Sequence, residues 1–269
     1  MNFEKIAFQT EEVAKLAGAF IASQVNQLKT GQVEVKGEHN YVTFVDKESE
    51  RIIVEGLTPL INSAVFLTEE ATVESRAGEW QWIVDPLDGT TNFIHGLPLF
   101  SVSIALVQNA NPVVGVVYEV NSGECFTAWA NGPALLNGNQ IGVSNCQLPD
   151  SALLATGFPY YDYNLLDQYL QLFADFMKNT RGLRRLGSAA VDLAWVAAGR
   201  FDAFYEYGLN PWDVAAGALL VKQAGGKVSH FDGSTNYLHG KRILASNGQL
   251  HETLLKTIGH YFPPETSIL

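Results

Sequence analysis

The chain has 269 residues, and its 47% hydrophobic and 17% charged content predicts a folded globular protein with a full core rather than a disordered one. A net charge of −11 argues against binding to nucleic acid through a broad basic face. Only Cys125 and Cys146 occur, and they form no CxxC motif, which argues against a disulfide scaffold or a structural zinc site.

The N-terminal segment predicts an amphipathic helix and no export signal. It lacks a basic region followed by an apolar core, and no apolar run in the chain approaches the ~18 residues needed to cross a membrane. We therefore expect a cytoplasmic protein with no membrane association. The helix is predicted from apolar residues at helical spacing, and it ends at Thr30-Gly31. These apolar residues are Val13, Leu16, Ala17, Phe20, Ile21, Val25 and Leu28.

Three acidic residues in the first part of the chain, Asp46, Glu69 and Glu70, are candidates for a functional site. Residues 33–41 are polar, and we expect them to be irregular. Asp46 then begins a predicted helix, where it acts either as the N-cap or as a residue of a functional site. Residues 64–67 predict a short buried strand that delivers Glu69 and Glu70 at its end. A pair of glutamates at such a point is usually a solvated turn.

An apolar run at residues 80–84 predicts a strand that ends in the sequence Asp85-Pro86-Leu87-Asp88-Gly89. The proline fixes its own φ and keeps the residue before it extended, and the glycine permits a turn that a side chain would obstruct. The next three residues, Thr90-Thr91-Asn92, are of the types that start helices. The stretch therefore predicts a strand, an acidic turn and the start of a helix.

The acidic turn has the chemistry of a metal and phosphate site. Asp85 and Asp88 could supply carboxylate ligands, with the Leu87 carbonyl between them, and Mg²⁺ and Mn²⁺ prefer such oxygens. The N–H groups after Gly89 suit a phosphate. Alone, the motif favours an ordinary turn, because Asp and Gly are common turn residues. A calcium loop of the EF-hand kind fits poorly, since Leu87 stands where such loops place a carboxylate or an amide. The prediction of metal-assisted phosphoryl transfer therefore depends on the other motifs in the chain.

The rest of the chain divides into two patterns. Residues 100–106, 112–120 and 124–130 predict an antiparallel meander joined by hairpins. Turn residues at 144–150 predict a boundary between an N-terminal α+β half, residues 1–147, and a C-terminal α/β half, residues 148–269. In the second half strands alternate with helices: strands at 152–155, 182–186, 201–207, 226–231 and 243–246, and helices at 165–177, 188–198, 211–224 and 250–258.

Five motifs occur in order along nearly the whole chain. They are Thr43-Phe44-Val45-Asp46, Leu67-Thr68-Glu69-Glu70, the stretch from Trp82 to Phe93, Leu186-Gly187-Ser188-Ala189-Ala190, and Pro211-Trp212-Asp213-Val214-Ala215-Ala216-Gly217. Together they closely resemble the signature of the inositol monophosphatase family, whose members are Mg²⁺-dependent, lithium-sensitive phosphatases. One departure is Thr68, because the family usually has Gly before the Glu-Glu pair.

The resemblance implies a fold and a set of metal ligands. The fold is a layered α-β-α-β-α sandwich of the sugar-phosphatase type, with an antiparallel N-terminal sheet and a mixed C-terminal α/β half. Two or three Mg²⁺ ions are expected, with Mn²⁺ as a substitute and with Li⁺ and Ca²⁺ as inhibitors. The N-terminal half would carry most of the metal ligands, and the C-terminal half would carry one of them and the substrate residues. The implied ligands are Glu69, Asp85, the Leu87 carbonyl, Asp88 and Asp213.

Roles in catalysis and substrate binding follow from the same resemblance. Thr90, oriented by Asp46, would position a water and help remove its proton, with Glu69 as the third catalytic residue. Ser188 is equally an ordinary N-cap, Glu206 equally an exposed acid at a strand end, and Asp213 equally an acid favoured by the helix dipole. His95 is interpreted as a helix-end residue, because water activated by a metal needs no imidazole. The implied substrate-binding residues are Asp88, Gly89, Thr90, Gly187, Ser188, Ala189, Glu206 and Asp213.

The sequence thus predicts a phosphatase for a phosphorylated polyol, foremost myo-inositol monophosphate, by direct attack of water. Phosphatases of the same superfamily that act on 3′-phosphoadenosine 5′-phosphate, fructose 1,6-bisphosphate or histidinol phosphate are alternatives. A hypothesis of another class is a non-catalytic, metal-dependent regulatory binding protein. The resemblance also implies a homodimer, and no nucleic-acid partner is expected. The role of Glu70 stays open.

Overall fold

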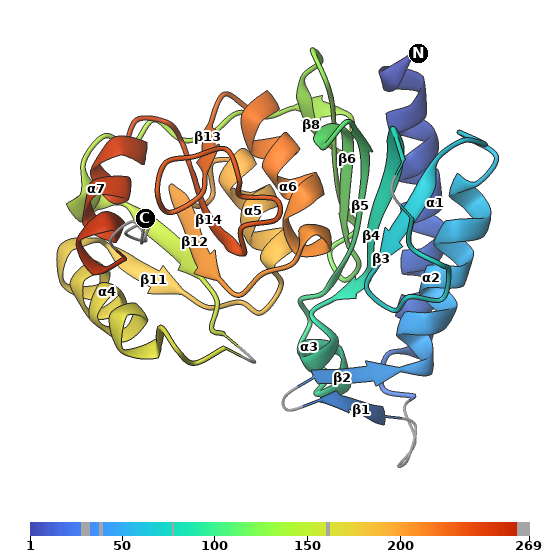
Figure 1. Cartoon of the computed structure of the whole chain (residues 1–269), viewed down its shortest axis with the longest axis horizontal. Coiled ribbons are helices and arrows are strands. Elements are labelled where there is room, and N and C mark those ends of the chain that lie inside the picture. The colour runs from blue at the N-terminus through green and yellow to red at the C-terminus, as the bar shows by residue number, and fades with distance from the viewer. Residues whose placement is uncertain (28–32, 38–39, 77, 160–161, 263–269) are drawn as a thin grey trace, which may run out of the picture.

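Five layers, alternately helical and sheet, make up the molecule (Figure 1). The structure, a computed structural model, describes residues 1–27, 33–37, 40–76, 78–159 and 162–262. The layered sandwich expected from the sequence is confirmed. None of the helices in these ranges has the length and apolar character that crossing a bilayer requires.

The larger sheet has seven strands in the order β3-β4-β5-β6-β7-β8-β9. The expected meander forms its centre, and each neighbouring pair from β4 onward is antiparallel. The first strand differs from the expected antiparallel pattern, because β3 runs parallel to β4 at the edge. The strands are β3 (Val65–Thr68), β4 (Trp80–Asp88), β5 (Ser101–Gln108), β6 (Asn111–Glu119), β7 (Glu124–Trp129), β8 (Ala134–Leu136) and β9 (Asn139–Gln140).

Helices α1 (Phe3–Gln24) and α2 (Phe44–Leu57) cover the outer face of this sheet (Figure 1). The Asn2 side chain accepts a hydrogen bond from Lys5 N, so α1 begins about ten residues before the periodic pattern became visible. The buried stripe runs through Ala14, Ala17 and Ile21, whereas Leu16, expected in the stripe, is 62% exposed. Leu28, Thr30 and Gly31 lie outside the described residues.

Residues 33–41 were expected to be irregular, and that expectation is wrong for the part described. Strands β1 (Val33–Gly37) and β2 (Asn40–Thr43) pair antiparallel, with Val33 opposite Thr43. The alternating sequence Val33-Glu34-Val35-Lys36 is a short strand pattern. It was obscured by the polar residues around it.

The smaller sheet has five strands in the order β11-β10-β12-β14-β13 and is mixed, as expected for the second half. Helices α4 (Leu166–Asn179) and α7 (His251–Tyr261) pack on its outer face. A short 3₁₀ helix, η1 (Pro149–Ser151), precedes the first of its strands, within the turn region where the boundary was predicted. The division into two halves at residue 147 remains a prediction. The strands are β10 (Leu153–Thr156), β11 (Gly182–Arg184), β12 (Ala203–Tyr207), β13 (Lys227–Ser229) and β14 (Arg242–Ser246).

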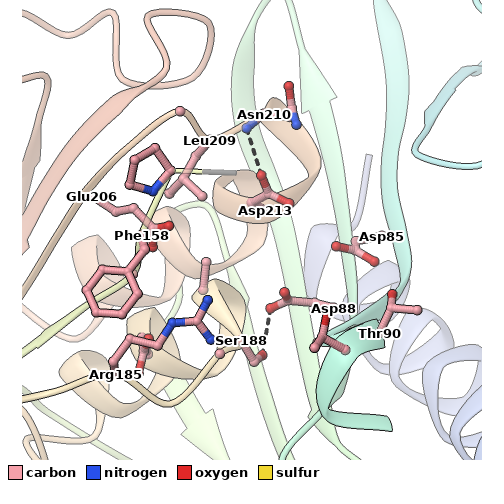
Figure 2. Close-up of a pocket in the computed structure, with 18 of the residues that line it drawn as sticks. Asp85, Asp88, Thr90, Phe158, Arg185, Ser188, Glu206, Leu209, Asn210 and Asp213 are labelled. Atoms are coloured by element: carbon pink, nitrogen blue, oxygen red, sulfur yellow. Dashed lines mark hydrogen bonds between the residues drawn. The ribbon is translucent and has the colours of Figure 1, made fainter. Parts of the chain in front are cut away.

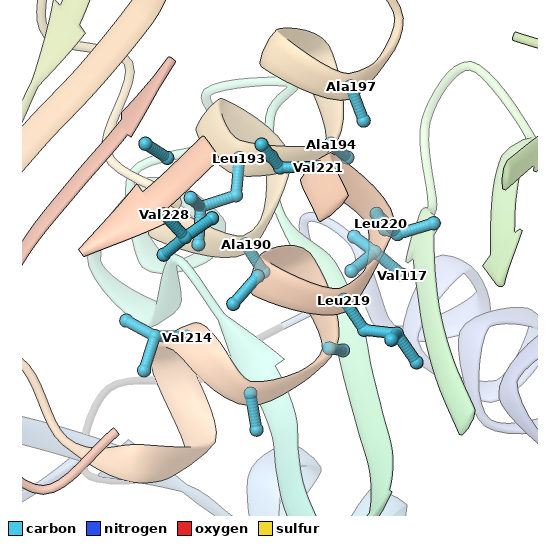
Figure 3. Packing of buried hydrophobic residues seen from close by; sticks show 14 of the residues in the cluster. Val117, Ala190, Leu193, Ala194, Ala197, Val214, Leu219, Leu220, Val221 and Val228 are labelled. Atoms are coloured by element: carbon cyan, nitrogen blue, oxygen red, sulfur yellow. The ribbon is translucent and has the colours of Figure 1, made fainter. Parts of the chain in front are cut away.

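The middle layer is a pair of helices, α5 (Ala189–Ala197) and α6 (Pro211–Gln223), buried between the two sheets (Figures 1 and 3). Small residues allow this packing. A Cβ on Gly115 of β6 would lie 2.8 Å from the carbonyl oxygen of Ala216, and a Cβ on Gly217 would lie 2.4 Å from the Leu193 Cβ. The run Ala215-Ala216-Gly217 therefore lets α6 approach a strand on one side and α5 on the other.

One buried histidine joins the last elements of the chain. His251 has no exposed surface, and its Nδ1 and Nε2 lie 2.9 Å and 3.0 Å from the hydroxyls of Ser246 and Ser229. Because the Ser229 hydroxyl donates to the His230 carbonyl, it accepts from Nε2–H, and Nδ1 then accepts from Ser246. Burial, followed by the nearby Lys227, lowers the pKa of His251 to about 4.

This histidine makes the stability of the fold depend on pH. Its folded pKa of about 4 lies below the ordinary value of 6.5, so the unfolded chain binds the proton first. The contribution of neutral His251 to the free energy of unfolding is fully present above pH ~6.5. It is lost as the pH falls toward 4, and the total loss is about 3 kcal/mol. Urea unfolding at several pH values measures it. His251→Asn should flatten the slope between pH 7 and 4, whereas His239→Gln, at an exposed position, should not; equal slopes in all three proteins would contradict the assignment.

Candidate active site

The site is built around a bulge at the end of β4. Asp85 pairs with Ser103 of β5 and Asp88 pairs with Ser101, so three residues of β4 span the length of two residues of β5. In a regular strand, residues three apart point to opposite faces of the sheet. The extra residue corrects this alternation and lets both carboxylates face one cleft. Pro86 suits the bulge, because it has no N–H to leave unpaired.

Gly89 then turns the chain into the short helix α3 (Thr90–Ile94). Its φ is +99°, a left-handed conformation that favours glycine. A Cβ here would also lie 3.2 Å from the Leu99 carbonyl oxygen and 3.3 Å from the Gly187 carbonyl oxygen. The turn thus brings the first residues of α3 close to the second half of the chain.

Hydrogen bonds hold Asp85, Leu87, Thr90 and Asp46 as one unit. The Leu87 N–H donates to Asp85 Oδ1 at 3.0 Å, which orients that carboxylate. The Thr90 hydroxyl lies 3.0 Å from both the Leu87 carbonyl oxygen and Asp46 Oδ1. The other oxygen of Asp46 accepts from Thr43 N at 2.8 Å and from Thr43 Oγ1 at 2.6 Å.

The interpretation of Asp46 as an N-cap is therefore wrong. Thr43 is the N-cap of α2, and Asp46 is the third helical residue of a capping box. One Asp46 oxygen closes the box and the other faces Thr90, so its structural and site roles coexist. Burial, only partly offset by these hydrogen bonds, raises the pKa of Asp46.

Asp88 connects the central turn with α5, and Asp213 is held within the first turn of α6 (Figure 2). Asp88 Oδ2 accepts from Ser188 Oγ at 2.6 Å and from Ala190 N at 2.8 Å, at the start of α5. Ser188 is also the N-cap of α5, as the sequence allowed. At the start of α6, Asp213 Oδ2 accepts from Asn210 N at 2.7 Å.

Glu69 follows β3, on a loop that a buried glutamate holds in place. Glu50 of α2 has no exposed surface, and its carboxylate accepts from Thr68 Oγ1, Glu70 N and Thr72 N at 2.8 Å each, and from Thr72 Oγ1 at 2.6 Å. These donors flank Glu69 on both sides. Thr68, the departure from the family pattern, therefore has a function of its own as one of the donors.

These elements surround a cleft with a cavity volume of about 120 Å³ that opens to solvent. The cleft is strongly acidic, since Glu69, Asp85, Asp88 and Asp213 all line it. Burial and the neighbouring Glu69, Asp88 and Asp213 carboxylates hold the pKa of Asp85 well above its usual range. Burial also raises the pKa of Asp88 and, together with Asp88 itself, that of Asp213. A cation between the carboxylates would favour their ionised forms.

A divalent cation fits this donor set. Carboxylate oxygens with one backbone carbonyl are the ligands that Mg²⁺ and Mn²⁺ prefer. Within the described ranges, however, no three acidic, His or Cys side chains converge closely enough to form a finished metal cage. Asp88 and Asp213 each direct one oxygen to a helix N-terminus, and a cation would need only the second oxygen of each.

Comparison with known proteins identifies the relatives of this cleft. The model of the inositol monophosphatase family matches residues 2–261. The chain belongs to the inositol monophosphatase family. It is 43% identical to Nus factor SuhB of Pseudomonas aeruginosa, over 93% of this chain and 94% of that protein. It is 39% identical to the inositol-1-monophosphatase of Mesorhizobium japonicum, over 92% and 93% of the two chains. The crystal structure of extragenic suppressor protein suhB from Bartonella henselae superposes with a TM-score of 0.89 and 36% identity, covering 94% of this chain and 98% of that one.

Family membership makes the chain a phosphatase of a generally metal-dependent family that acts on small phosphorylated substrates. Each site residue expected from the sequence either lines the cleft or forms a hydrogen bond with a residue that does. Gly89, Thr90, Gly187, Ser188, Ala189 and Glu206 lie in its wall together with the four carboxylates and Leu87. Asp46 reaches the wall through Thr90. His95 ends α3 and is not part of the cleft lining.

The far end of the cleft contains residues that sequence reasoning missed (Figure 2). Arg185 lies there with its guanidinium 5.4 Å from the Phe158 ring centroid, a cation–π contact. The Glu206 carboxylate packs on Gly157, where a Cβ would lie 2.1 Å from both of its oxygens. Burial raises the pKa of Glu206 to about 8. Asp192 of α5 also lines this end.

Asn92 is another missed residue, because its type alone indicated only a helix start. Its side-chain amide lies 2.8 Å from the Leu99 carbonyl oxygen and 2.9 Å from the Leu186 carbonyl oxygen. It thereby ties α3 to the segment that leads into α5. The signal that could have found it is its place within the central motif, two residues after Thr90.

Glu50 provides a test of how the Glu69 loop is held. In Glu50→Gln, the side-chain NH₂ would face an N–H or hydroxyl donor, so we expect the free energy of unfolding to fall by about 1–3 kcal/mol. Urea denaturation measures this change. The matched control is Glu55→Gln on the same helix, where the side chain is 64% exposed and pairs with Arg51. Equal effects of the two substitutions would show that the loop does not depend on Glu50.

Proposed function

We propose that this protein is a Mg²⁺-dependent phosphatase that hydrolyses the phosphate monoester of a polyol, foremost myo-inositol monophosphate, to the free polyol and phosphate. One observation carries the proposal. Four carboxylates from three distant parts of the chain meet in one cleft, beside a hydroxyl that bonds to a buried aspartate. This arrangement combines oxygen ligands for cations with a group that can handle a proton.

The metal would be held by Glu69, Asp85, the Leu87 carbonyl, Asp88 and Asp213. Two or three Mg²⁺ ions, which Mn²⁺ could replace, would supply Lewis-acid stabilisation of the charge on the phosphoryl oxygens and on the attacking and leaving oxygens. They would also reverse the sign of the field that an anionic substrate meets in an acidic cleft. As the family resemblance implies, we expect Li⁺ and Ca²⁺ to inhibit.

Thr90 and Asp46 would prepare the water that attacks phosphorus. The Thr90 hydroxyl has two acceptors at 3.0 Å, Asp46 Oδ1 and the Leu87 carbonyl oxygen, which direct its hydrogen toward one of these two oxygens. Its lone pairs then accept a hydrogen bond from the water and hold it in place. As the water loses its proton to Thr90 Oγ1, the hydroxyl hydrogen can pass to Asp46 Oδ1.

Phosphate and polyol would occupy opposite parts of the cleft. The N–H groups that follow Gly89 would bind the phosphate at the start of α3. Asp88, Asp213 and the segment Gly187-Ser188-Ala189 would border the middle of the substrate, and Glu206 would bind the leaving alcohol. Acidic side chains suit hydroxyl donors, which favours a polyol over an adenine ring.

A comparison of kcat/KM among four phosphate esters tests which one is the substrate. Inositol 1-phosphate should be hydrolysed with a higher kcat/KM than 3′-phosphoadenosine 5′-phosphate, fructose 1,6-bisphosphate and histidinol phosphate. A preference for one of the other three would keep the phosphatase and change its substrate. The relative in Mesorhizobium japonicum is named inositol-1-monophosphatase, which supports the first choice.

A second candidate function is regulatory binding. The Pseudomonas aeruginosa relative is named Nus factor SuhB rather than as a phosphatase, at 43% identity. Inactivity toward all four esters would favour this second function, and robust turnover would leave room for both. We further propose a homodimer located in the cytoplasm, to be checked by light scattering and cell fractionation.

Asp88→Asn tests the catalytic proposal. The substitution keeps the shape of the side chain but removes the charge that holds cations, so Mg²⁺-dependent phosphate release should fall at least about a hundredfold. Circular dichroism should show an intact fold, because the amide oxygen can still accept from Ser188. Asp150→Asn, at an exposed position in η1, is the control and should retain activity. Full activity of Asp88→Asn would overturn the scheme.

Thr90→Ala and Thr90→Ser separate the hydroxyl from the rest of the side chain. Loss of the hydroxyl should lower kcat by about 10²-fold, the usual contribution of a positioned proton acceptor, with a smaller effect on Mg²⁺ affinity. The serine variant keeps the hydroxyl and should retain most of the activity. Steady-state kinetics across a Mg²⁺ titration measures both quantities. A serine variant as impaired as the alanine variant would show that the hydroxyl is not what matters.

A further inference from the structure

Asp192 stands out among the acidic residues of the cleft. It is the fourth residue of α5, its side chain is only 1% exposed, and it lines the far end of the cleft near Glu206. Its Oδ1 is buried and has no hydrogen-bond partner among the described residues. Leaving a buried polar atom unpaired costs about 1–3 kcal/mol, so such an atom needs an explanation.

The helix itself does not explain it. An acid near the start of a helix can cap free N–H groups, but at α5 that role is filled. Ser188 Oγ accepts from Val191 N, Asp88 Oδ2 accepts from Ala190 N, and the Asp192 N–H donates to the Ser188 carbonyl oxygen. The Asp192 carboxyl is therefore not needed to satisfy the first turn.

The surroundings of Asp192 indicate the kind of ligand it would take. Two acids, Glu206 and Asp88, and one cation, Arg185, act on its charge. Burial, followed by these two acids, holds the pKa of Asp192 well above its usual range. A carboxyl in such a place suits a neutral ligand group that can donate or accept a hydrogen bond, and a second anion would be repelled by its neighbours. An alcohol hydroxyl has these properties.

We propose that Asp192 binds a hydroxyl of the leaving alcohol, next to the hydroxyl that Glu206 binds. The inference rests on the proposed phosphatase function and makes its substrate more specific. The leaving alcohol carries at least two hydroxyls remote from the phosphate, and they reach the deep end of the cleft. Asp192 is thus a specificity-determining residue that pairs with substrate and takes no part in the attack on phosphorus.

The test compares a polyol ester with an ester that has no further hydroxyl. For inositol 1-phosphate, Asp192→Ala should raise KM about tenfold or more, the loss of one hydrogen bond to a charged or acidic group, and leave kcat within about threefold. For phenyl phosphate, kcat/KM should stay within about twofold of the wild type. Asp192→Asn keeps the volume and one acceptor oxygen, so its KM should be intermediate.

Ser49→Ala is the matched control, because Ser49 Oγ is also buried without a partner among the described residues but lies outside the cleft lining. It should leave the ratio of the two substrates unchanged. A parallel loss for both esters in the Asp192 variants, or no loss for either, would overturn the inference, since a structural role predicts no discrimination. Thermal unfolding identifies a variant that does not fold, in which case Asp192→Asn decides. Failure of the wild type on both esters would instead overturn the proposed function.

Discussion

The site depends on one irregularity in a strand. Without the extra residue between Asp85 and Asp88, the alternation of β4 would place one carboxylate in the cleft and the other on the opposite face of the sheet. The bulge brings both to the same side and ends the pairing at the point where Gly89 turns the chain. The rest of the cleft, including Glu69 from β3 and Asp213 from α6, is assembled around that pair.

The acidic side chains of this cleft lie together because hydrogen bonds from the backbone hold them in place. Asp88 and Asp213 each accept from backbone N–H groups at helix N-termini, and Asp85 accepts from the N–H of Leu87. These donors offset part of the repulsion and burial, and a cation would offset the remainder. The two halves of the chain are thus joined by polar bonds at the site as well as by the apolar packing of α5 and α6 between the sheets (Figure 3).

Much of this could be predicted from the sequence, because the information is local or carried by motifs. The strand and helix periods of the sequence predicted the order and approximate bounds of the elements after residue 147. The helix predicted at 211–224, for example, is α6, Pro211–Gln223. What could not be predicted depends on partners distant in sequence. From sequence Glu50 is an ordinary helix residue, and only the structure shows Thr72 beside it. Asp192 likewise resembles an acid favoured by the helix dipole, and only the structure shows its unpaired buried oxygen and its place in the cleft lining. The Asp46 capping box is the exception, because Thr43 lies only three residues earlier and the pattern is local.

The glycine at position 115 has a consequence for how such an enzyme can change. It lets α6, which has Asp213 in its first turn, pack directly on the sheet within the buried middle layer. Phe158 and Arg185, at the other end of the cleft, lie on connecting segments that tolerate substitution more easily. Substitutions in these segments can therefore change the far end of the cleft while the packing of α6 against the sheet stays the same.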